Sequence, residues 1–313
     1  MKKELFAKYR RAGITVFAEV NRLYSGKLKY LLWNTTSGLD GLIYILVYPS
    51  TSITQTPTLL ICDASTILYT GTITLAGTYG NYGAVYDGHI GIFTCSSNYG
   101  FYCYTFIYDK DSNTVTPERQ IYTARNWYWS NAYAYKKNND YYIVGTFNNS
   151  YRGPTTVNMS TGQYWANEFS PRNDMMFFYD NYNDPSNTFL ALSGARRSDN
   201  TQNYYLKKLP NTYNIGNSSG AAVSNGLSNS ALVSPYPVQF YDSYDKFMII
   251  GTYNSSVRLL PLSDDYTQLS VGSVQLPSGF HIQRMILLTN GTGWYCSPSP
   301  DFIFTEFDWT SYV

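Results

Sequence analysis

Charged side chains are scarce in this sequence. Asp, Glu, Lys and Arg make up only 14% of the 313 residues, against about 25% in a typical soluble domain. The formal net charge is +1. Such a chain has no long-range field that attracts DNA, RNA or an anionic membrane. We therefore expect no nucleic-acid partner.

Long apolar runs are lacking as well. No run reaches the roughly eighteen residues that a transmembrane helix needs. The first thirteen residues, MKKELFAKYRRAG, carry the positive charge of a secretory signal. The following stretch, residues 14–20 (ITVFAEV), is too short for the apolar part of such a signal and contains Glu19. The sequence therefore predicts neither membrane insertion nor a signal peptide.

Histidine is represented by His89 and His281 alone. Both lie in or beside expected strands, and neither has a second His or Cys at the spacing of a metal site. A structural or hydrogen-bonding role is favoured for both. The glycines fall at expected hairpins and form no phosphate-binding loop, and no G-x-S-x-G turn is present. We expect no cofactor and no metal.

Cysteine is also infrequent, with residues at 62, 95, 103 and 296. A hairpin centred on Tyr99 would place Cys95 and Cys103 on facing positions of adjacent strands, where a disulfide is geometrically possible. The alternative is two buried thiols that pack as small apolar side chains. A disulfide would fit an extracellular particle or a protein of a hyperthermophile.

Aromatic residues are abundant by contrast. The chain has 33 Tyr, 16 Phe and 6 Trp, which together make 18% of the sequence. Most of the polarity comes from Asn, Ser and Thr. This mixture favours strands and turns over helices, and it argues against disorder.

An internal repeat determines the architecture. Residues 135–152 read YKKNNDYYIVGTFNNSYR, and residues 241–258 read YDSYDKFMIIGTYNSSVR. The two copies align without a gap at a shift of 106 residues and share the Tyr, the Gly-Thr, an Asn, a Ser and the closing Arg. A repeat of this kind indicates stacked units of one supersecondary structure.

The most apolar strand of each unit recurs six times, at spacings of 47 to 58 residues. Near-continuous apolar runs of this length suit strands that are buried on both faces. The six predicted strands are residues 42–48 (LIYILVY), 89–95 (HIGIFTC), 141–147 (YYIVGTF), 188–194 (TFLALSG), 246–253 (KFMIIGTY) and 293–297 (GWYCS).

Turns with Asp or Asn precede most of these strands, as at Asp87, Asp180 and Asp242. Such residues stabilise tight hairpins and tolerate left-handed backbone. Their equivalence from unit to unit favours a role in the turn over a catalytic one, because a catalytic pair needs inequivalent carboxylates. A second marked turn, Asp109 to Asn113 and Asn158 to Gly162, joins the expected third and fourth strands.

Repeated units of four strands and about 40 to 50 residues are typical of a β-propeller. We predict an all-β, six-bladed β-propeller of four-stranded antiparallel blades. Residues 14–20 are predicted as a strand that closes the ring by completing the last blade, so that no sheet edge is exposed. The expected organisation is a basic N-terminal segment (1–13), which is either a solvated terminus or a docking peg, and a single propeller domain (14–313). The predicted blades are 28–80, 81–126, 127–170, 171–234, 235–278 and 279–313.

The chain resembles β-propellers over nearly its whole length, without the signature of a named repeat family. The turn YDKDSNTV is similar to the corresponding turn of kelch repeats, but the kelch Gly-Gly doublet is absent. In its high Tyr, Asn, Ser and Thr and its low charge, the chain is similar to structural proteins of viruses that infect thermoacidophilic archaea, and tailed-phage tail proteins share part of this composition. That resemblance implies a thermostable virion or extracellular surface component.

Aromatic residues in expected loops are the candidate binding residues. Tyrosines among Asn and Ser make contact surfaces for sugars or proteins at a low entropy cost, although Tyr also serves as an ordinary strand residue. The candidates are Trp127, Tyr128, Trp129, Tyr151, Tyr182, Tyr204 and Tyr213; Tyr79, Tyr82 and Tyr99 are also expected in loops.

The sequence favours a non-enzymatic binding or structural protein whose partner is a host-surface glycan or another virion protein. The alternative is a hydrolase or lactonase-like enzyme with a metal or acidic residues at the central channel. Three converging acidic or Asn side chains would favour the enzyme, and an aromatic rim would favour binding.

Overall fold

In the computed structural model of this protein, the described elements are β-strands and one α-helix near the N-terminus, α2 (Val16–Leu23). Within this described part, no helix has the length and apolar character needed to cross a membrane. The structure describes residues 14–34, 42–54, 56–75, 79–95, 101–123, 129–137, 139–147, 155–166, 173–176, 179–180, 188–196, 202–210, 227–229, 238–241, 247–251, 257–261, 274–275, 285–287, 292–297, 300–308 and 311.

The first eight strands form one sheet of two antiparallel halves, in the order β4-β3-β2-β1-β5-β6-β7-β8. The halves meet through a short parallel pairing of β1 with β5, in which Trp33 lies opposite Ala84. We name the halves sheet 1 (β1 to β4) and sheet 2 (β5 to β8). The strands are β1 (Lys29–Asn34), β2 (Ile43–Val47), β3 (Thr58–Cys62), β4 (Ile67–Thr72), β5 (Tyr79–Tyr86), β6 (His89–Cys95), β7 (Phe101–Asp109) and β8 (Thr114–Tyr122).

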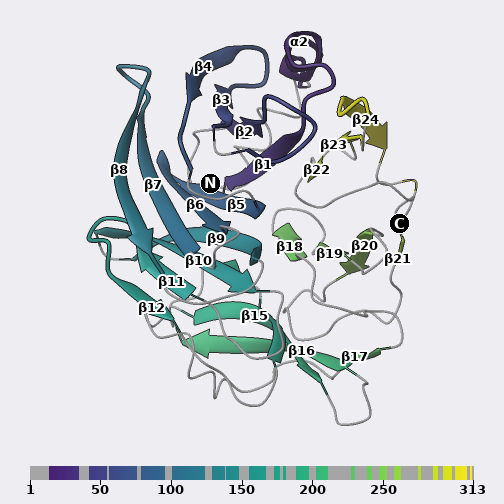
Figure 1. The fold of residues 1–313 in the computed structure, drawn as a ribbon. Coiled ribbons are helices and arrows are strands. Elements are labelled where there is room, and N and C mark those ends of the chain that lie inside the picture. Colours follow the sequence, from purple (N-terminus) through teal and green to yellow (C-terminus); the bar gives the residue numbers. More distant parts are fainter. Residues whose placement is uncertain are drawn as a thin grey trace.

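The later strands form four further sheets, each built from consecutive antiparallel strands. Sheet 3 is β9 to β12, and the next sheets are β13 to β17, β18 to β21 and β22 to β24. Figure 1 shows these sheets following one another in chain order around a common centre. The strands are β9 (Trp129–Lys137), β10 (Asp140–Phe147), β11 (Thr155–Asn158), β12 (Tyr164–Ala166), β13 (Asn173–Met176), β14 (Tyr179–Asp180), β15 (Thr188–Arg196), β16 (Gln202–Pro210), β17 (Leu227–Asn229), β18 (Val238–Tyr241), β19 (Phe247–Gly251), β20 (Val257–Pro261), β21 (Val274–Gln275), β22 (Met285–Leu287), β23 (Thr292–Cys296) and β24 (Phe304–Asp308).

The predicted all-β class and four-stranded antiparallel sheets are confirmed. Each of the six predicted apolar strands coincides with an observed strand that pairs with the first strand of its sheet. These observed strands are β2, β6, β10, β15, β19 and β23. The two copies of the repeat fall on equivalent strands, because their apolar runs form β10 and β19. Arg258 lies in β20 opposite Ile250, whereas Arg152 is outside the described residues.

The prediction of a strand at residues 14–20 is wrong, because α2 covers most of this stretch. A strand would present alternate residues to one side, whereas the helix buries Val16, Phe17 and Val20 together. Ala18 and Glu19 face solvent. This spacing places three large side chains on one helical face. The last sheet therefore gains a helix as its neighbour instead of a fourth strand from this stretch.

The core consists of layers between neighbouring sheets. Phe93 and Cys103 of sheet 2 pack in one cluster with Ile143 and Val157 of sheet 3, and all four are fully buried. Gly91 makes this packing possible, since a Cβ built there would lie 2.5 Å from the Cδ1 of Ile143. The small residues within the apolar strands therefore set how closely the sheets approach.

The predicted Asp and Asn turns are confirmed where the structure describes them. Asp87 and Gly88 both have positive φ, at 51° and 75°, as a tight two-residue hairpin requires. Between the last two strands of sheets 1 and 3, the side-chain oxygens of Asp63 and Asn158 accept hydrogen bonds from backbone N–H groups two and three residues ahead. Asp180 ends β14, and Asp242 lies outside the described residues.

The candidate Cys95–Cys103 disulfide is not formed, and the alternative of a buried thiol holds for Cys103. The hairpin of β6 and β7 exists, but its register places Phe101 opposite Cys95 and Phe93 opposite Cys103. Cys103 is a free thiol with no exposed surface. A hairpin centred one residue earlier than Tyr99 explains the difference, because it moves the partner of Cys95 by two positions.

Candidate binding surface

The sheets have two distinct ends. The turns with Asp63, Asp87, Asp109 and Asn158 all follow strands that run in the same direction through sheets 1 to 3, so they define one end, the Asp-turn end. At the opposite end, the chain leaves the last strand of sheet 2, β8, and enters the first strand of sheet 3, β9. These two ends carry different side chains and are described in turn.

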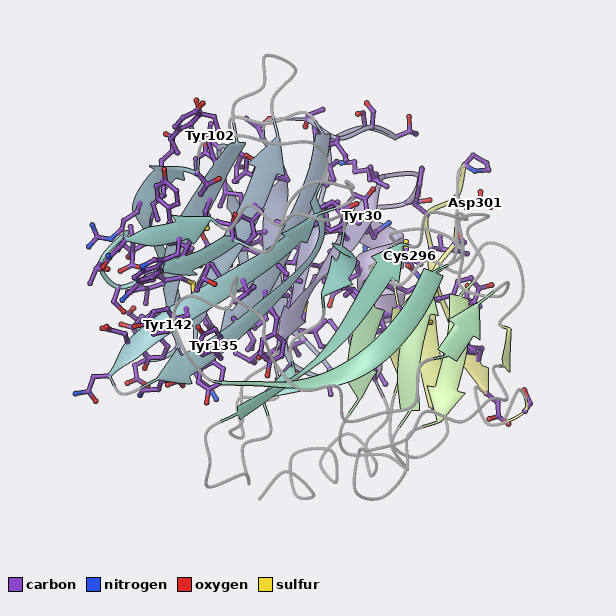
Figure 2. All side chains as sticks on the ribbon, turned by 90° about the horizontal axis from the view of Figure 1, so that it is seen from below. Tyr30, Tyr102, Tyr135, Tyr142, Cys296 and Asp301 are labelled. Atoms are coloured by element: carbon purple, nitrogen blue, oxygen red, sulfur yellow. The ribbon has the colours of Figure 1, made fainter. Side chains whose placement is uncertain are left out.

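Three tyrosines form an aromatic cluster toward the opposite end of sheet 2. Tyr102 and Tyr122 are cross-strand partners on β7 and β8, with ring centroids 5.4 Å apart and 60° between the ring planes. The ring of Tyr104 lies 6.2 Å from that of Tyr102. We refer to Tyr102, Tyr104 and Tyr122 as the tyrosine cluster, and Tyr102 is labelled in Figure 2.

Exposure differs sharply within the tyrosine cluster. Tyr104 is 8% exposed, whereas Tyr122 is 51% exposed. Alternation along β7 explains the arrangement, since Tyr102 and Tyr104 share one face while Cys103 enters the core on the other. Tyr104 anchors the cluster, and Tyr122 presents an open ring. A tyrosine ring that is fixed at one edge and open on a face is suited to contact with an apolar surface that also offers hydrogen bonds.

The predicted residues Trp127 and Tyr128 lie on the connection that follows Tyr122 and are outside the described residues. Trp129 was expected in a loop, but it is the first residue of β9, opposite Phe147. The strand extends this far because β10 offers backbone partners up to its last residue. The tyrosine cluster and the start of β9 thus belong to the same stretch of chain, separated by residues 123–128.

The remaining predicted binding residues are not brought together by the described structure. Tyr204 lies within β16, opposite Gly194, and not in a loop. Tyr79 and Tyr82 likewise lie in β5. Backbone pairing with a neighbouring strand decides whether these tyrosines lie in a strand or in a loop. The composition of the sequence alone does not reveal this pairing. Tyr151, Tyr182, Tyr213 and Tyr99 are outside the described residues, and a binding role for these tyrosines stays a prediction.

A polar cluster joins sheets 2 and 3 at the Asp-turn end. The rings of His89 and Tyr141 stack with centroids 3.4 Å apart and 11° between their planes. The Tyr141 hydroxyl donates to Oδ2 of Asp87 at 3.3 Å and accepts from Nζ of Lys136 at 3.2 Å. The same ammonium lies 4.9 Å from the centre of the Tyr141 ring. Nδ1 of His89 lies 3.0 Å from the backbone oxygen of Asp87.

The predicted structural role of His89 agrees with this arrangement. The ring of Tyr141 has His89 against it and Lys136 above it, so its faces are occupied within the protein. The cluster therefore resembles an inter-sheet contact more than an open ligand site. Sequence analysis missed it because Asp87 and Tyr141 are 54 positions apart. An alignment of consecutive repeats could have indicated this contact, because both residues lie at the start of equivalent hairpins.

The turn carboxylates are held as hydrogen-bond acceptors. Partial burial acts to raise the pKa of Asp63, but hydrogen bonds from Ser65 and Thr66 outweigh it and lower the pKa. Hydrogen bonds from Ser112 and Asp111 lower the pKa of Asp109. Both groups are therefore anions that stabilise turns. Among the residues that the structure describes, no three His, Cys, Asp or Glu side chains come together as a metal site.

The chain is similar to several solved structures at low sequence identity. A triple arginine-to-alanine mutant of AofleA from Arthrobotrys oligospora matches with a TM-score of 0.56 and 5% identity, over 90% of this chain and 83% of that one. SapL1 lectin in complex with alpha methyl fucoside gives 0.48 and 11%, over 79% of each chain. The WD40 repeats of RRP9 give 0.45 and 13%, over 82% of this chain and 69% of that one.

No protein-family model matches the chain, and no curated protein matches its sequence. At these identities the structural likeness concerns the fold alone. The chain is all-β with four-stranded antiparallel sheets, and it shares its fold with AofleA at a TM-score of 0.56.

Proposed function

We propose that this chain is a non-enzymatic binding protein that recognises a glycan or a protein partner through the end of sheets 2 and 3 where the tyrosine cluster lies. The observation that carries the proposal is Tyr122, a residue that is 51% exposed at the end of β8 while the ring of its partner Tyr102 packs against it from one side. A large aromatic surface held open in this way is better suited to a partner than to water.

The sequence next to the cluster is also rich in aromatic residues. Trp129 begins the next strand, and Trp127 and Tyr128 precede it in the sequence. A net charge of +1 favours an uncharged partner over an anionic polymer. Tyr and Trp next to small polar residues form contact surfaces for sugars and for proteins alike. The class of partner is therefore a glycan or a protein surface of low charge.

The wider setting of the proposal is a six-bladed propeller that acts as a virion or extracellular surface component, with a host-surface glycan or a neighbouring virion protein as partner. Support for this setting comes from the repeat spacing and from the composition, which is rich in Tyr, Asn, Ser and Thr and poor in charge. Both features suit a repeated structural protein with a large contact surface.

An enzyme site at the centre of the sheets is the less supported candidate. Such a site needs acidic or Asn side chains that converge on the innermost strands. The first strands of sheets 1 to 3, β1, β5 and β9, contact one another; they contain one Asn each (Asn34, Asn81 and Asn131) but neither Asp nor Glu, so they supply no carboxylate for acid–base catalysis. Pairing of the β1 and β5 backbones at Trp33 and Ala84 also brings these two strands into direct contact.

A glycan array and a binding assay with the hits test the proposal. Tyr122→Ala is expected to weaken binding roughly tenfold or more, since an aromatic contact contributes on the order of 1 kcal/mol beyond its area. The matched control is Tyr164→Ala, because Tyr164 is 38% exposed and begins β12 beside the Asn158 turn, at the Asp-turn end. Equal binding by wild type and Tyr122→Ala, or equal loss in both variants, would contradict the proposal.

A further inference from the structure

Helix α2 packs directly against the last sheet of the chain. The ring of Phe17 stacks on that of Phe304 in β24, with centroids 4.2 Å apart and 21° between the planes. The ring of Trp294 in β23 lies 5.2 Å from the same side chain. Phe17 has no exposed surface. Figure 1 shows α2 beside β24, at opposite extremes of the colour scale.

Asn21 adds a pair of hydrogen bonds to this contact. Its Nδ2 donates to the backbone oxygen of Phe304 at 2.8 Å, and its Oδ1 accepts from the backbone N–H of Phe304 at 2.7 Å. A neighbouring strand would satisfy the N–H and C=O of one residue in the same way. The side-chain amide of Asn21 thus takes the place of a strand at this point of the β24 edge.

Two more polar contacts run from the N-terminal part to the turn before β24. The N–H of Gly26 donates to the oxygen of Asp301 at 3.1 Å. Nζ of Lys29 donates to the oxygen of Phe302 at 2.6 Å, and also to the oxygens of Tyr24 and Lys27. Lys29 has no exposed surface, so its ammonium is held by backbone carbonyls inside the protein.

We propose that residues 16–29 form a latch that holds the β22 to β24 sheet against sheet 1, and that this latch can open without unfolding sheets 1 and 2. Asn21, Gly26 and Lys29 each form at least one hydrogen bond with the backbone of residues 301–304. Sheets 1 and 2 are joined by backbone pairing of β1 with β5 at two positions and by a shared core, whereas the described join between residues 16–29 and β24 with its preceding turn consists of side-chain contacts and one backbone hydrogen bond, from Gly26 to Asp301. Joins of this kind open at a lower free energy than the core ladders.

Native-state hydrogen exchange of the full chain tests the latch. Asn21→Ala removes both bonds to Phe304, and the expected result is roughly tenfold faster exchange in peptides from β22 to β24. Peptides from β2, β3 and β6 should keep wild-type rates. Glu19→Ala is the control, because Glu19 lies on the exposed face of the same helix.

Two results would overturn the latch. One is unchanged exchange in β22 to β24, and the other is an equal acceleration in every sheet. If Asn21→Ala does not fold, Asn21→Asp carries the same test, because its carboxylate keeps the acceptor for the Phe304 N–H and loses the donor to the Phe304 oxygen. The latch contacts do not involve the tyrosine cluster. The result of the binding assay with Tyr122→Ala and the result of this exchange experiment are therefore independent.

Discussion

His89 and Tyr141 lie face to face across the boundary of sheets 2 and 3, with ring centroids 3.4 Å apart. Each ring comes from the strand that follows a tight turn in its own sheet, so equivalent hairpins of two consecutive sheets meet at this point. The Tyr141 hydroxyl then reaches Asp87 on the first hairpin and Lys136 on its own. Stacking and hydrogen bonding can be separated by mutation.

Tyr141→Phe removes both hydroxyl contacts and keeps the stack on His89. We expect it to lower the free energy of unfolding by at most about 1 kcal/mol, because Asp87 and Lys136 are exposed and water competes for them. Tyr141→Ala also removes the ring, so the expected loss is about 3 kcal/mol. Urea unfolding of both variants measures the difference, with Tyr164→Phe as control. Equal losses for Phe and Ala would show that the hydroxyl, and not the stack, joins the sheets.

Gly91→Ala is expected to separate sheets 2 and 3. The added methyl group would lie 2.5 Å from Cδ1 of Ile143, so the free energy of unfolding should fall by about 1 to 3 kcal/mol. Shortening the neighbour with Ile143→Val should recover part of this loss in the double variant. Chemical denaturation of the two single variants and the double variant measures the coupling. Strictly additive losses would mean that the methyl group and Ile143 do not meet.

Lys29 provides a prediction on pH. Removal from water lowers the pKa of Lys29 from 10.5 to about 8, although nearby Cys296 acts in the opposite direction. Between those two values the unfolded chain binds more protons than the folded chain at this residue, so the free energy of unfolding rises with pH. Relative to Lys29→Met, which does not titrate, wild type should gain up to about 3 kcal/mol between about pH 7 and pH 10.5.

The free energy of unfolding is measured for wild type and for Lys29→Met at each pH, and the difference between the two proteins cancels the titration of all other groups. The control is Lys110→Met, since Lys110 is exposed in the turn between β7 and β8. A constant difference between wild type and Lys29→Met over the whole range would contradict the prediction. A rise in the stability of wild type relative to Lys29→Met as the pH falls would also contradict the prediction.

The buried thiols should be unreactive in the native protein. Burial is the largest cause that raises the pKa of Cys62 to about 12, and it also raises the pKa of Cys103. Little thiolate therefore forms at neutral pH, and the sulfur atoms are inaccessible. Alkylation followed by mass spectrometry should leave both residues unmodified until denaturant is added. Once denatured, Cys103 should react without a reductant. If a reductant is needed, the result would instead support the candidate disulfide with Cys95.

Much of the local structure followed from the residue pattern. The apolar run at residues 89–95 forms β6 with the predicted bounds, because a strand buried on both faces needs a continuous apolar stretch. Asp87 forms a left-handed turn, since Asp tolerates this backbone conformation and the following Gly favours it. The antiparallel groups of strands follow from the repeat of these two signals.

The tyrosine cluster was not predicted, although the sequence contains all of its members. Tyr102 and Tyr122 are twenty positions apart and become partners through the register of β7 with β8. Composition predicted that aromatic residues would form a contact surface, but it could not distinguish loop tyrosines from strand tyrosines. Tyr204 was assigned to a loop for this reason and lies in β16.

The sequence by itself determined the strand-rich fold, the order of the strands and the turns between them, because these depend on periodicity and backbone preference over a few residues. Only the tertiary structure decided what residues 14–20 become and which side chains meet between sheets. The β-branched residues of ITVFAEV favour a strand locally, but the apolar surface of β23 and β24 selects the helix that buries Val16, Phe17 and Val20 together. Contacts such as Asn21 with Phe304 join residues 283 positions apart, and no local preference specifies such a pairing.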